Sequence, residues 1–450
     1  MGACCSRPEV VESQEEDATG GLSEAYDVKH LLGSGSAGDT WLCQDRGSGD
    51  VVAIKLIKRP IPAAMSNSLV REVKIGAELG RGHLNIVRPR EVVLTRTHLG
   101  LVMDYVAGGN MADYILKSIL LKFGDFDRRD GLVMEEDEAL YFFKQIISAV
   151  AYCHEHKVAH RDLKMDNTLL DDHDPPRVML CDFGFARHWM GEPQMTTITG
   201  TPDYMSPQLL GAKLGALPGK EPYDGTKADI WAAGVMLCVM LIGRFPFEGI
   251  EMHNVHNLDD VSAHVWQMQT QTTTRWHDNP LIAHDCGMLS PDCIDLLNRM
   301  FELEEDKRVS VTDITEHPWF NRPLPPLYEG ALHELAVQQA AIDAEAAKGA
   351  YVSASRDSAL RAMINAAAAP YNPLSDDGVT LGHGGRVGHG ELSGAHLLRK
   401  ISLTGRTPSV TRGASASPDG GGGGAAVGGG LRISELELEV QQGRAAALAG

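Results

Sequence analysis

The sequence predicts an α+β protein of two lobes: a small β-rich lobe with one key helix, then a larger helical lobe. Three observations support this prediction. Residues 26–58 contain β-branched and apolar stretches broken by Gly-rich turns, a pattern typical of strands. One helical stretch, 69–79, separates them from further strand-like segments at 86–106. After Gly109 the pattern is helical almost throughout, and packing these layers leaves a cleft between two lobes.

The composition changes along the 450 residues. Apolar periodic segments alternate with short turns up to about Phe320, beyond which Ala, Gly and Ser dominate. We therefore predict a globular domain over 22–320, preceded by a flexible N-terminus, 1–21. A regulatory extension with a short helix, 321–370, and a low-complexity, mostly disordered tail, 371–450, are predicted to follow.

The charge and the cysteine content exclude some classes of function. With a formal net charge of −19, the chain is a poor candidate for neutralising a polyphosphate backbone, so no nucleic-acid partner is predicted. The eight cysteines form no C-x-x-C pair and follow no secretory signal, which predicts reduced thiols in the cytosol. The longest apolar run, 230–243, is shorter than the ~20 residues that span a bilayer and predicts a buried core helix.

A Gly-rich string opens the predicted small lobe. In GSGSAG, Gly33, Gly35 and Gly38 fit the pattern G-x-G-x-x-G, which is weak evidence alone because Gly-rich hairpins are common. Here a lysine, Lys55, follows on the next predicted strand. A flexible hairpin can cover phosphate groups, and a strand lysine can neutralise them. Because an unpaired buried charge is costly, Lys55 requires a partner, and Glu72 on the following helix is the candidate.

A polar segment, HRDLKMDN at 160–167, lies between two apolar runs. Asp162 can accept the proton of an attacking hydroxyl group, and Lys164 can balance charge on a transferred phosphoryl group. Asn167, together with Asp182 of the string DFG, offers hard oxygen ligands suited to Mg²⁺. Each acid alone could be a solvated loop charge, but the ordered set of motifs makes that interpretation weak.

The motifs carry a resemblance to a known family. Over about residues 26–320 the chain resembles a eukaryotic protein kinase, and HRDLK together with GTPDYMSP resembles the serine/threonine class. The strings CDFGFAR and YDGTKADIWAAGVMLCVMLIGRFPFE are similar to plant and green-algal sucrose-non-fermenting-related kinases of subfamily two. The resemblance implies a bilobal kinase fold and transfer of the γ-phosphate of ATP to protein Ser/Thr hydroxyls. It also implies a role in stress or nutrient signalling.

The resemblance assigns roles to individual residues. It implies that Lys55, paired with Glu72, holds the α- and β-phosphates, that Asp162 is the base, and that Asn167 and Asp182 bind Mg²⁺. Lys164 and Asn167 complete the implied catalytic set. The implied ATP-binding residues are Gly33, Ser34, Gly35, Gly38, Ala53, Lys55, Glu72, the gatekeeper Met103, and the hinge residues Asp104, Tyr105 and Val106.

The surroundings of this set partly follow the family pattern. Thr201 is expected to buttress Asp162 and Lys164, and Asp229 is expected to hold the backbone of the 160–167 segment. Gln208 departs from the pattern, since a glutamate there normally pairs with an arginine. We expect Gln208 to hydrogen-bond Arg308 without forming an ion pair.

Control by phosphorylation is also predicted. An arginine before the catalytic Asp, here Arg161, usually awaits a phosphate on the activation loop. Alignment by length favours Thr197, with Thr196 and Thr199 as alternatives, and implies an upstream kinase and a phosphatase as partners. The alternative is that these threonines are simply polar loop residues.

Two segments of the C-terminal region have patterns that predict a helix and a phosphorylation site. Residues 355–370 read as a helix with one apolar stripe, which resembles the subfamily's regulatory box and is expected to pack on the small lobe's helix. The alternative is a marginal Ala-rich helix in a linker. In LLRKISL, Arg399 precedes Ser402 by three positions, so Ser402 is a candidate autophosphorylation site or, alternatively, an unmodified serine.

The N-terminus predicts lipidation. Gly2 and Ser6 of MGACCSRP fit the N-myristoylation pattern, and Cys4 and Cys5 lie where palmitoylation would occur. A single myristoyl chain gives only marginal membrane binding, so stable attachment depends on palmitate. We predict a cytoplasmic protein with the alternative of a membrane-anchored one. An ordinary flexible terminus also remains open.

Two other functions are alternatives to an active protein kinase. A pseudokinase keeps the fold as a binding module, but usually loses the equivalents of Lys55, Asp162 or Asp182, and all three are present. A kinase of small metabolites fits poorly because GTPDYMSP resembles the segment that shapes a peptide groove.

Overall fold

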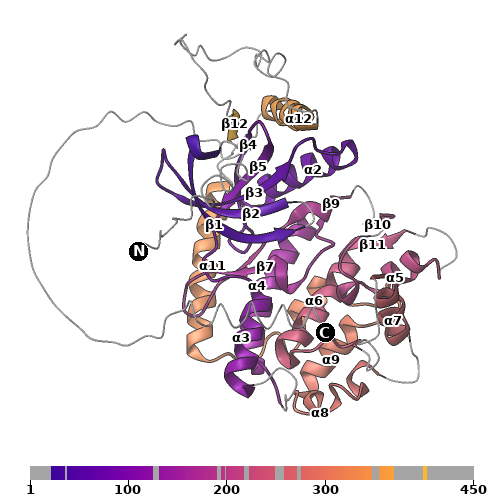
Figure 1. The fold of residues 1–450 in the computed structure, drawn as a ribbon. Helices are drawn as coiled ribbons and strands as arrows, with labels where there is room; N and C mark the ends of the chain where they lie inside the picture. The colour runs from indigo at the N-terminus through magenta and orange to yellow at the C-terminus, as the bar shows by residue number, and fades with distance from the viewer. Residues whose placement is uncertain are drawn as a thin grey trace, which may run out of the picture. The chain divides into compact units, whose positions relative to one another are not determined.

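The fold was analysed in a computed structural model of the chain. The predicted α+β bilobal architecture is confirmed: a β-sheet N-lobe is followed by a helical C-lobe (Figure 1). The structure describes residues 22–35, 38–124, 131–189, 194–197, 199–216, 222–248, 258–270, 275–346, 354–368 and 399–402.

The N-lobe is built on one antiparallel sheet with the strand order β1-β2-β3-β5-β4-β12. Five of its strands come from the predicted strand-rich segments, and a short 3₁₀ turn, Leu22–Glu24, precedes them. The sixth strand comes from the region predicted to be mostly disordered tail. The strands are β1 (Tyr26–Gly35), β2 (Gly38–Asp45), β3 (Val51–Lys58), β4 (Pro89–Leu94), β5 (His98–Asp104) and β12 (Arg399–Ser402).

Helix α2 (Ala63–Leu79) is the key helix of the N-lobe and begins earlier than the predicted start at residue 69. Its interior glycine, Gly76, packs closely against the start of β4: a Cβ atom there would lie 3.3 Å from Cγ of Pro89. Gly76 therefore allows close approach of helix and strand, although glycine lowers helix propensity by up to about 1 kcal/mol relative to alanine.

Helix α12 (Ala354–Ala368) confirms the predicted apolar stripe on 355–370 and its packing against the small lobe's helix (Figure 1). Ile364 is fully buried, and the stripe shares one hydrophobic cluster with residues of α2, β4 and β5. Burial of each Leu, Ile or Met side chain contributes about 1.5–3 kcal/mol. The stripe comprises Leu360, Met363, Ile364 and Ala367.

The C-terminus of α12 is also tied to the N-lobe through backbone groups. Arg59 donates from Nη2 to the Ala366 carbonyl oxygen at 2.7 Å, and the Ile61 amide donates to the Ala367 oxygen at 3.0 Å. These contacts satisfy carbonyl groups that a helix leaves unpaired in its last turn.

Helix α11 (Pro326–Ala346) was not predicted; only one short helix was expected in this extension. Tyr328 stacks on Tyr141 with ring centroids 4.9 Å apart, which attaches the start of α11 to the C-lobe. Further along, Gln339 donates from Nε2 to the Gly82 oxygen at 2.6 Å, and its Oε1 accepts from the Leu84 amide at 3.0 Å. The helix therefore braces the loop that follows α2.

The C-lobe is mainly helical and encloses helix α6. Nearly every residue of α6 is buried, as expected for a helix that is apolar all round. By length and composition alone α6 could cross a membrane, but 89% of that window is buried in the protein, in line with the predicted core helix. The C-lobe helices are α3 (Met111–Phe123), α4 (Glu136–Glu155), α5 (Pro207–Leu214), α6 (Gly225–Ile242), α7 (Leu258–Thr270), α8 (Ala283–Cys286), α9 (Pro291–Met300) and α10 (Val311–Glu316).

Short two-stranded ladders hold loops of the C-lobe. They pair β6 with β9, β7 with β8, and β10 with β11. Their bounds are β6 (Val158–Ala159), β7 (Thr168–Leu170), β8 (Val178–Leu180), β9 (Arg187–His188), β10 (Gln194–Met195) and β11 (Tyr223–Asp224).

The departure from the family pattern at Gln208 is explained by two hydrogen bonds. As predicted, Arg308 donates to Gln208 Oε1, at 2.9 Å from Nη2. The amide nitrogen of Gln208 makes a second contact that was not predicted, donating to the Leu303 oxygen at 2.6 Å. A carboxylate could accept from Arg308 but could not donate to Leu303, so glutamine satisfies both neighbours.

We predict that Ile364→Asp lowers the phosphoryl-transfer activity that the family resemblance implies, by releasing α12 from α2. An unpaired charge at this fully buried position costs about 3–5 kcal/mol, comparable with the burial energy of the stripe. The measurement is the turnover of the full-length chain with a protein substrate. The matched control is Asn365→Asp, which puts the same acid on the exposed face of α12. Equal turnover of both variants and wild type would show that α12 does not support α2.

Candidate functional site

The Gly-rich hairpin joins β1 to β2. In its register Gly33 lies opposite Thr40, Ser34 opposite Asp39 and Gly35 opposite Gly38. Gly38 has φ +139°, and a Cβ atom there would come within 1.9 Å of the Leu56 carbonyl oxygen. Only glycine fits this close approach to β3. The hairpin tip, 36–37, lies outside the described residues.

A three-residue charge cluster joins β3, α2 and the DFG segment. The ammonium group of Lys55 lies 3.1 Å from Glu72 Oε1 and 3.7 Å from Asp182 Oδ1. The side chains of Lys55 and Glu72 are only 13% and 12% exposed. Burial alone would lower the pKa of Lys55, but the two carboxylates outweigh it and raise the pKa to about 12. The predicted pairing of Lys55 with Glu72 is confirmed.

The backbone of the DFG segment aims Asp182 at Lys55. Asp182 has a left-handed conformation with φ 61°, and its Oδ1 accepts a hydrogen bond from the Gly184 amide at 3.2 Å. Burial would raise the pKa of Asp182, but Lys55 and the Gly184 amide outweigh it and lower the pKa. A Cβ atom on Gly184 would lie 3.0 Å from Asp182 Oδ1, so glycine keeps the carboxylate accessible.

Within 160–167, two side chains converge on the carboxylate of Asp162, which is 4% exposed. Asn167 donates from Nδ2 to Asp162 Oδ2 at 2.9 Å, and Lys164 Nζ lies 3.1 Å from the same oxygen. Lys164 also donates to Thr201 Oγ1 at 3.2 Å, as predicted. The arrangement holds one carboxylate oxygen and leaves the other outside these contacts.

Asp229 at the N-terminal part of α6 holds the backbone of this segment, as predicted. Its Oδ2 accepts from the His160 amide at 2.9 Å and its Oδ1 from the Arg161 amide at 2.7 Å. His154 Nε2 lies 2.9 Å from Oδ2. These contacts stabilise Arg161 in a left-handed conformation with φ 68°, rarely adopted by a residue other than glycine.

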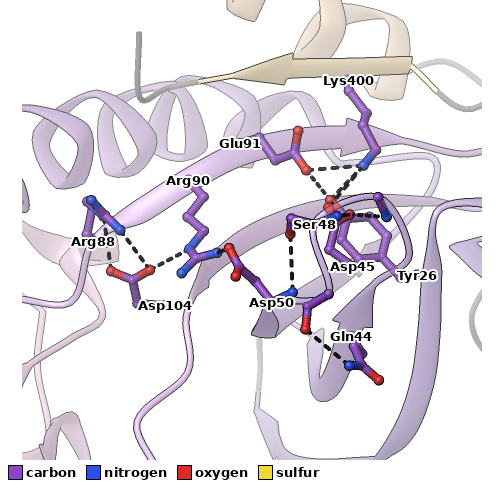
Figure 2. A network of polar contacts seen from close by, with 12 residues as sticks. Tyr26, Gln44, Asp45, Ser48, Asp50, Arg88, Arg90, Glu91, Asp104 and Lys400 are labelled. Carbon is purple, nitrogen blue, oxygen red and sulfur yellow. Dashed lines mark hydrogen bonds and ion pairs between the residues drawn. The ribbon is translucent and has the colours of Figure 1, made fainter. Parts of the chain in front are cut away.

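The hinge residues follow the gatekeeper position at the end of β5. Met103 lies opposite Ala53 of β3 in the sheet register. Sequence reasoning missed two arginines that fix the next residue: Arg88 and Arg90 approach the Asp104 carboxylate at 3.0 and 2.5 Å (Figure 2). The remaining hinge residues, Tyr105 and Val106, continue from there towards α3.

The three activation-loop threonines differ in their contacts with arginine side chains. Arg187 donates from Nη2 to Thr197 Oγ1 at 3.3 Å, and Arg161 Nη2 donates to the Thr197 carbonyl oxygen. Burial, together with the positive charges of Arg187 and Arg161, lowers the pKa of Arg71. Within the described part of the loop, no arginine contact of this kind is recorded for Thr196 or Thr199.

The residues present fit ATP and Mg²⁺. The amide nitrogen of Asn167 donates to Asp162, which leaves its side-chain carbonyl oxygen outside that contact as a hard donor. The described ranges contain no group of three or more His, Cys, Asp or Glu side chains that could hold a metal.

These features define an ATP-dependent phosphotransferase. They are a β-rich lobe with a Gly-rich hairpin, a strand lysine paired with a glutamate, and the set of Asp162, Lys164 and Asn167 in the C-lobe. A family model described as Protein kinase domain matches residues 26–320, and the chain belongs to the protein kinase family. The enzyme is a serine/threonine protein kinase that acts on protein substrates and binds ATP.

Curated relatives confirm the resemblance to subfamily two. The chain is 36% identical over 302 residues to serine/threonine-protein kinase SAPK9 of Oryza sativa subsp. japonica, covering 67% of this chain and 73% of the relative. It is 36% identical over 308 residues to serine/threonine-protein kinase SRK2E of Arabidopsis thaliana, with the same two coverages. It is 36% identical over 310 residues to SRK2C of Arabidopsis thaliana, covering 69% and 79%.

Proposed function

We propose that this kinase transfers the γ-phosphoryl group of ATP to protein Ser/Thr hydroxyls with Asp162 as the catalytic base, in stress or nutrient signalling. The observation that supports this most directly is the Asp162 carboxylate, held by Asn167 and Lys164 while Thr201 positions Lys164. The signalling role is supported by the resemblance to subfamily two.

The nucleotide would be bound by both lobes. Lys55, oriented by Glu72, is proposed to neutralise the α- and β-phosphates, and the hairpin glycines to cover them through backbone amides. Backbone groups of 104–106 would bind adenine, with Met103 and Ala53 bordering it. Mg²⁺ held by Asn167 and Asp182 would neutralise charge that develops on the phosphates.

In the proposed step the substrate hydroxyl oxygen forms a bond to the γ-phosphorus. The bond from that phosphorus to the bridging oxygen breaks, ADP leaves, and the hydroxyl proton passes to Asp162. Its Oδ1 is available for this proton because Asn167 and Lys164 both contact Oδ2. Lys164 would stabilise negative charge on the transferring group.

We predict that Asp162→Asn lowers kcat by about 10²–10⁴-fold, because an amide cannot accept the hydroxyl proton. Turnover of a protein substrate is compared with that of Asp172→Asn, which makes the same change at an exposed loop position. ATP affinity should change little in either variant. Unaltered kcat in Asp162→Asn would remove Asp162 from its proposed role.

Activity is proposed to rise when an upstream kinase phosphorylates Thr197, and to fall when a phosphatase removes that phosphate. Two guanidinium groups, from Arg161 and Arg187, contact Thr197. Their mutual repulsion would be relieved by a phosphate, which carries a charge of about −1.5 to −2 at neutral pH. Thr196 and Thr199 remain weaker alternatives.

We predict that Thr197→Ala cannot be activated by an upstream kinase, whereas Thr196→Ala can. The measurement is turnover before and after treatment with a phosphatase, with mass spectrometry of the loop peptide. Wild type should lose activity on treatment, and Thr197→Ala should start low and stay unchanged. If Thr197→Ala and wild type respond equally to phosphatase, another threonine carries the control.

The N-terminal assignments, Gly2, Cys4 and Cys5, lie outside the described residues. We propose a cytoplasmic enzyme that is held at membranes by myristate on Gly2 and palmitate on Cys4 or Cys5. The sequence MGACCS supports this, while the acidic residues that follow oppose binding to an anionic surface.

We predict that the full-length chain, expressed in a eukaryotic cell, fractionates with membranes and that Gly2→Ala does not. Without myristate the two cysteines would not meet membrane-bound acyltransferases, and no second signal would remain. A Ser6→Ala variant with Gly2 retained should be affected less. Identical fractionation of wild type and Gly2→Ala would contradict anchoring.

A further inference from the structure

The outer edge of the N-lobe sheet is occupied by a segment from the far end of the chain. β12 pairs antiparallel with β4, with Lys400 opposite Val93, Ile401 opposite Val92 and Ser402 opposite Glu91. An uncovered edge strand presents unpaired amide and carbonyl groups that can accept another strand. In Figure 1 β12 lies beside β4, which places this segment on that edge.

One side chain of β12 enters an acidic site on the sheet. Lys400 Nζ lies 3.3 Å from Glu91 Oε1 and 3.7 Å from Asp45 Oδ2, and it donates to the Tyr26 hydroxyl at 3.0 Å (Figure 2). The ammonium group also lies 4.1 Å from the centre of the Tyr26 ring, a distance suited to a cation–π interaction. The site therefore favours a cation at the second position of the docked strand.

The acidic site is assembled from three strands, because Tyr26, Asp45 and Glu91 belong to β1, β2 and β4. The Tyr26 hydroxyl donates to Glu91, which fixes the carboxylate in place. Burial and this contact raise the pKa of Tyr26, so its hydroxyl keeps its proton near neutral pH. Glu91 and Asp45 are only 18% and 23% exposed, so their negative charges are partly desolvated and benefit from a cation.

We propose that the outer edge of β4, with this acidic site, is a docking site for the chain's own residues 399–402 and that phosphate on Ser402 releases them. A docked phosphoserine would place a charge of about −1.5 to −2 directly opposite Glu91. Like charges facing each other across a strand pair are destabilising. A four-residue strand makes few hydrogen bonds, so such repulsion can shift its occupancy.

The phosphate would come from ATP: the Ser402 hydroxyl oxygen forms a bond to the γ-phosphorus, ADP leaves, and the proton is released. This modification step rests on the proposed catalytic function, and on Arg399 three positions before Ser402 as a basic determinant. The docking itself does not depend on catalysis. The two parts of the proposal can therefore fail separately.

Release of β12 would also weaken the contact between α12 and the N-lobe. α12 contacts β12 as well as α2, β4 and β5. A docked β12 therefore encloses one side of α12, and the strand adds its contacts to those of the apolar stripe. Phosphate on Ser402 could therefore affect α2, the helix that carries Glu72, through the contacts of β12 with α12.

The test is hydrogen–deuterium exchange of the full-length chain, read at the amides of β4 and of 399–402. Every sample carries Asp162→Asn, so that Ser402 stays unphosphorylated. On this background Lys400→Glu and Ser402→Asp should each speed exchange about tenfold, since either change places a negative charge against the acidic site. Ser402→Ala should exchange like its parent. Lys58→Glu makes the matched charge change at an exposed position of β3 outside the docking site.

Exchange that is equally fast in the parent and in Lys400→Glu would overturn the docking site. Slow exchange in all variants, including Ser402→Asp, would overturn release by phosphate. The occupant is tested by repeating the measurement over a hundredfold range of protein concentration with light scattering. Protection that appears only with dimerisation would assign the edge to a second copy of the chain and overturn the intramolecular assignment. Failure of the wild type to phosphorylate Ser402 would remove only autophosphorylation as the phosphate source.

Discussion

The ion pair between Lys55 and Glu72 is the constraint on which the site depends. It joins the sheet to α2, and through Asp182, 3.7 Å from Lys55, it joins both to the C-lobe. Neither Lys55 nor Glu72 is well solvated. Displacement of α2 by less than one helical turn would leave a partly buried charge without its partner, at a cost of about 3–5 kcal/mol. The nucleotide site is therefore complete only when α2 is in this position. Elements that contact α2 can change the activity without contacting the substrate.

Besides the ion pair and the packing on the sheet, three further sets of contacts position α2 or the loop after it, and two of them come from beyond the kinase domain. Ser68 donates to the Gly184 carbonyl oxygen at 3.3 Å, which links the helix to the DFG segment. The apolar stripe of α12 covers another face, and Gln339 of α11 binds the loop after the helix through the nitrogen and the oxygen of its side-chain amide. Within the lobe, α2 buries Leu69, Val70 and Val73 in the same cluster, and Gly76 allows its close approach to the start of β4. The extension thus adds apolar support to the packing that α2 already has.

The site was predictable because its chemistry demands particular residue types in a particular order. Lys55, Glu72, Asp162 and Asn167 each carry a group that few other residues could replace, and the pairing of Lys55 with Glu72 followed from charge alone. The α12 stripe was predictable because apolar spacing reports the buried face of a helix. Helix α11 lacks that signal, since none of its residues is fully buried and one half-buried amide does the bracing.

What sequence reasoning missed was fixed by tertiary proximity rather than by local pattern. The residues that receive Lys400 are separated by 19 and 46 positions, from Tyr26 to Asp45 to Glu91, and only the sheet order brings them together. The arginines that hold Asp104, and the second hydrogen bond of Gln208, depend on neighbours in the same way. A four-residue strand carries too little pattern to be recognised within a Gly-rich tail.

The two attachments of the extension differ in physical character, and that difference bears on regulation. α12 is held mainly by apolar burial, which neither a phosphate nor salt removes. β12 is held by a few backbone hydrogen bonds and one cation among partly exposed carboxylates, interactions that added negative charge and ionic strength both weaken. Because α12 touches both α2 and β12, the stable contact can support the helix continuously while the electrostatic contact adjusts how firmly it does so. Such a division lets the support of α2 and the adjustment of that support rest on separate surfaces.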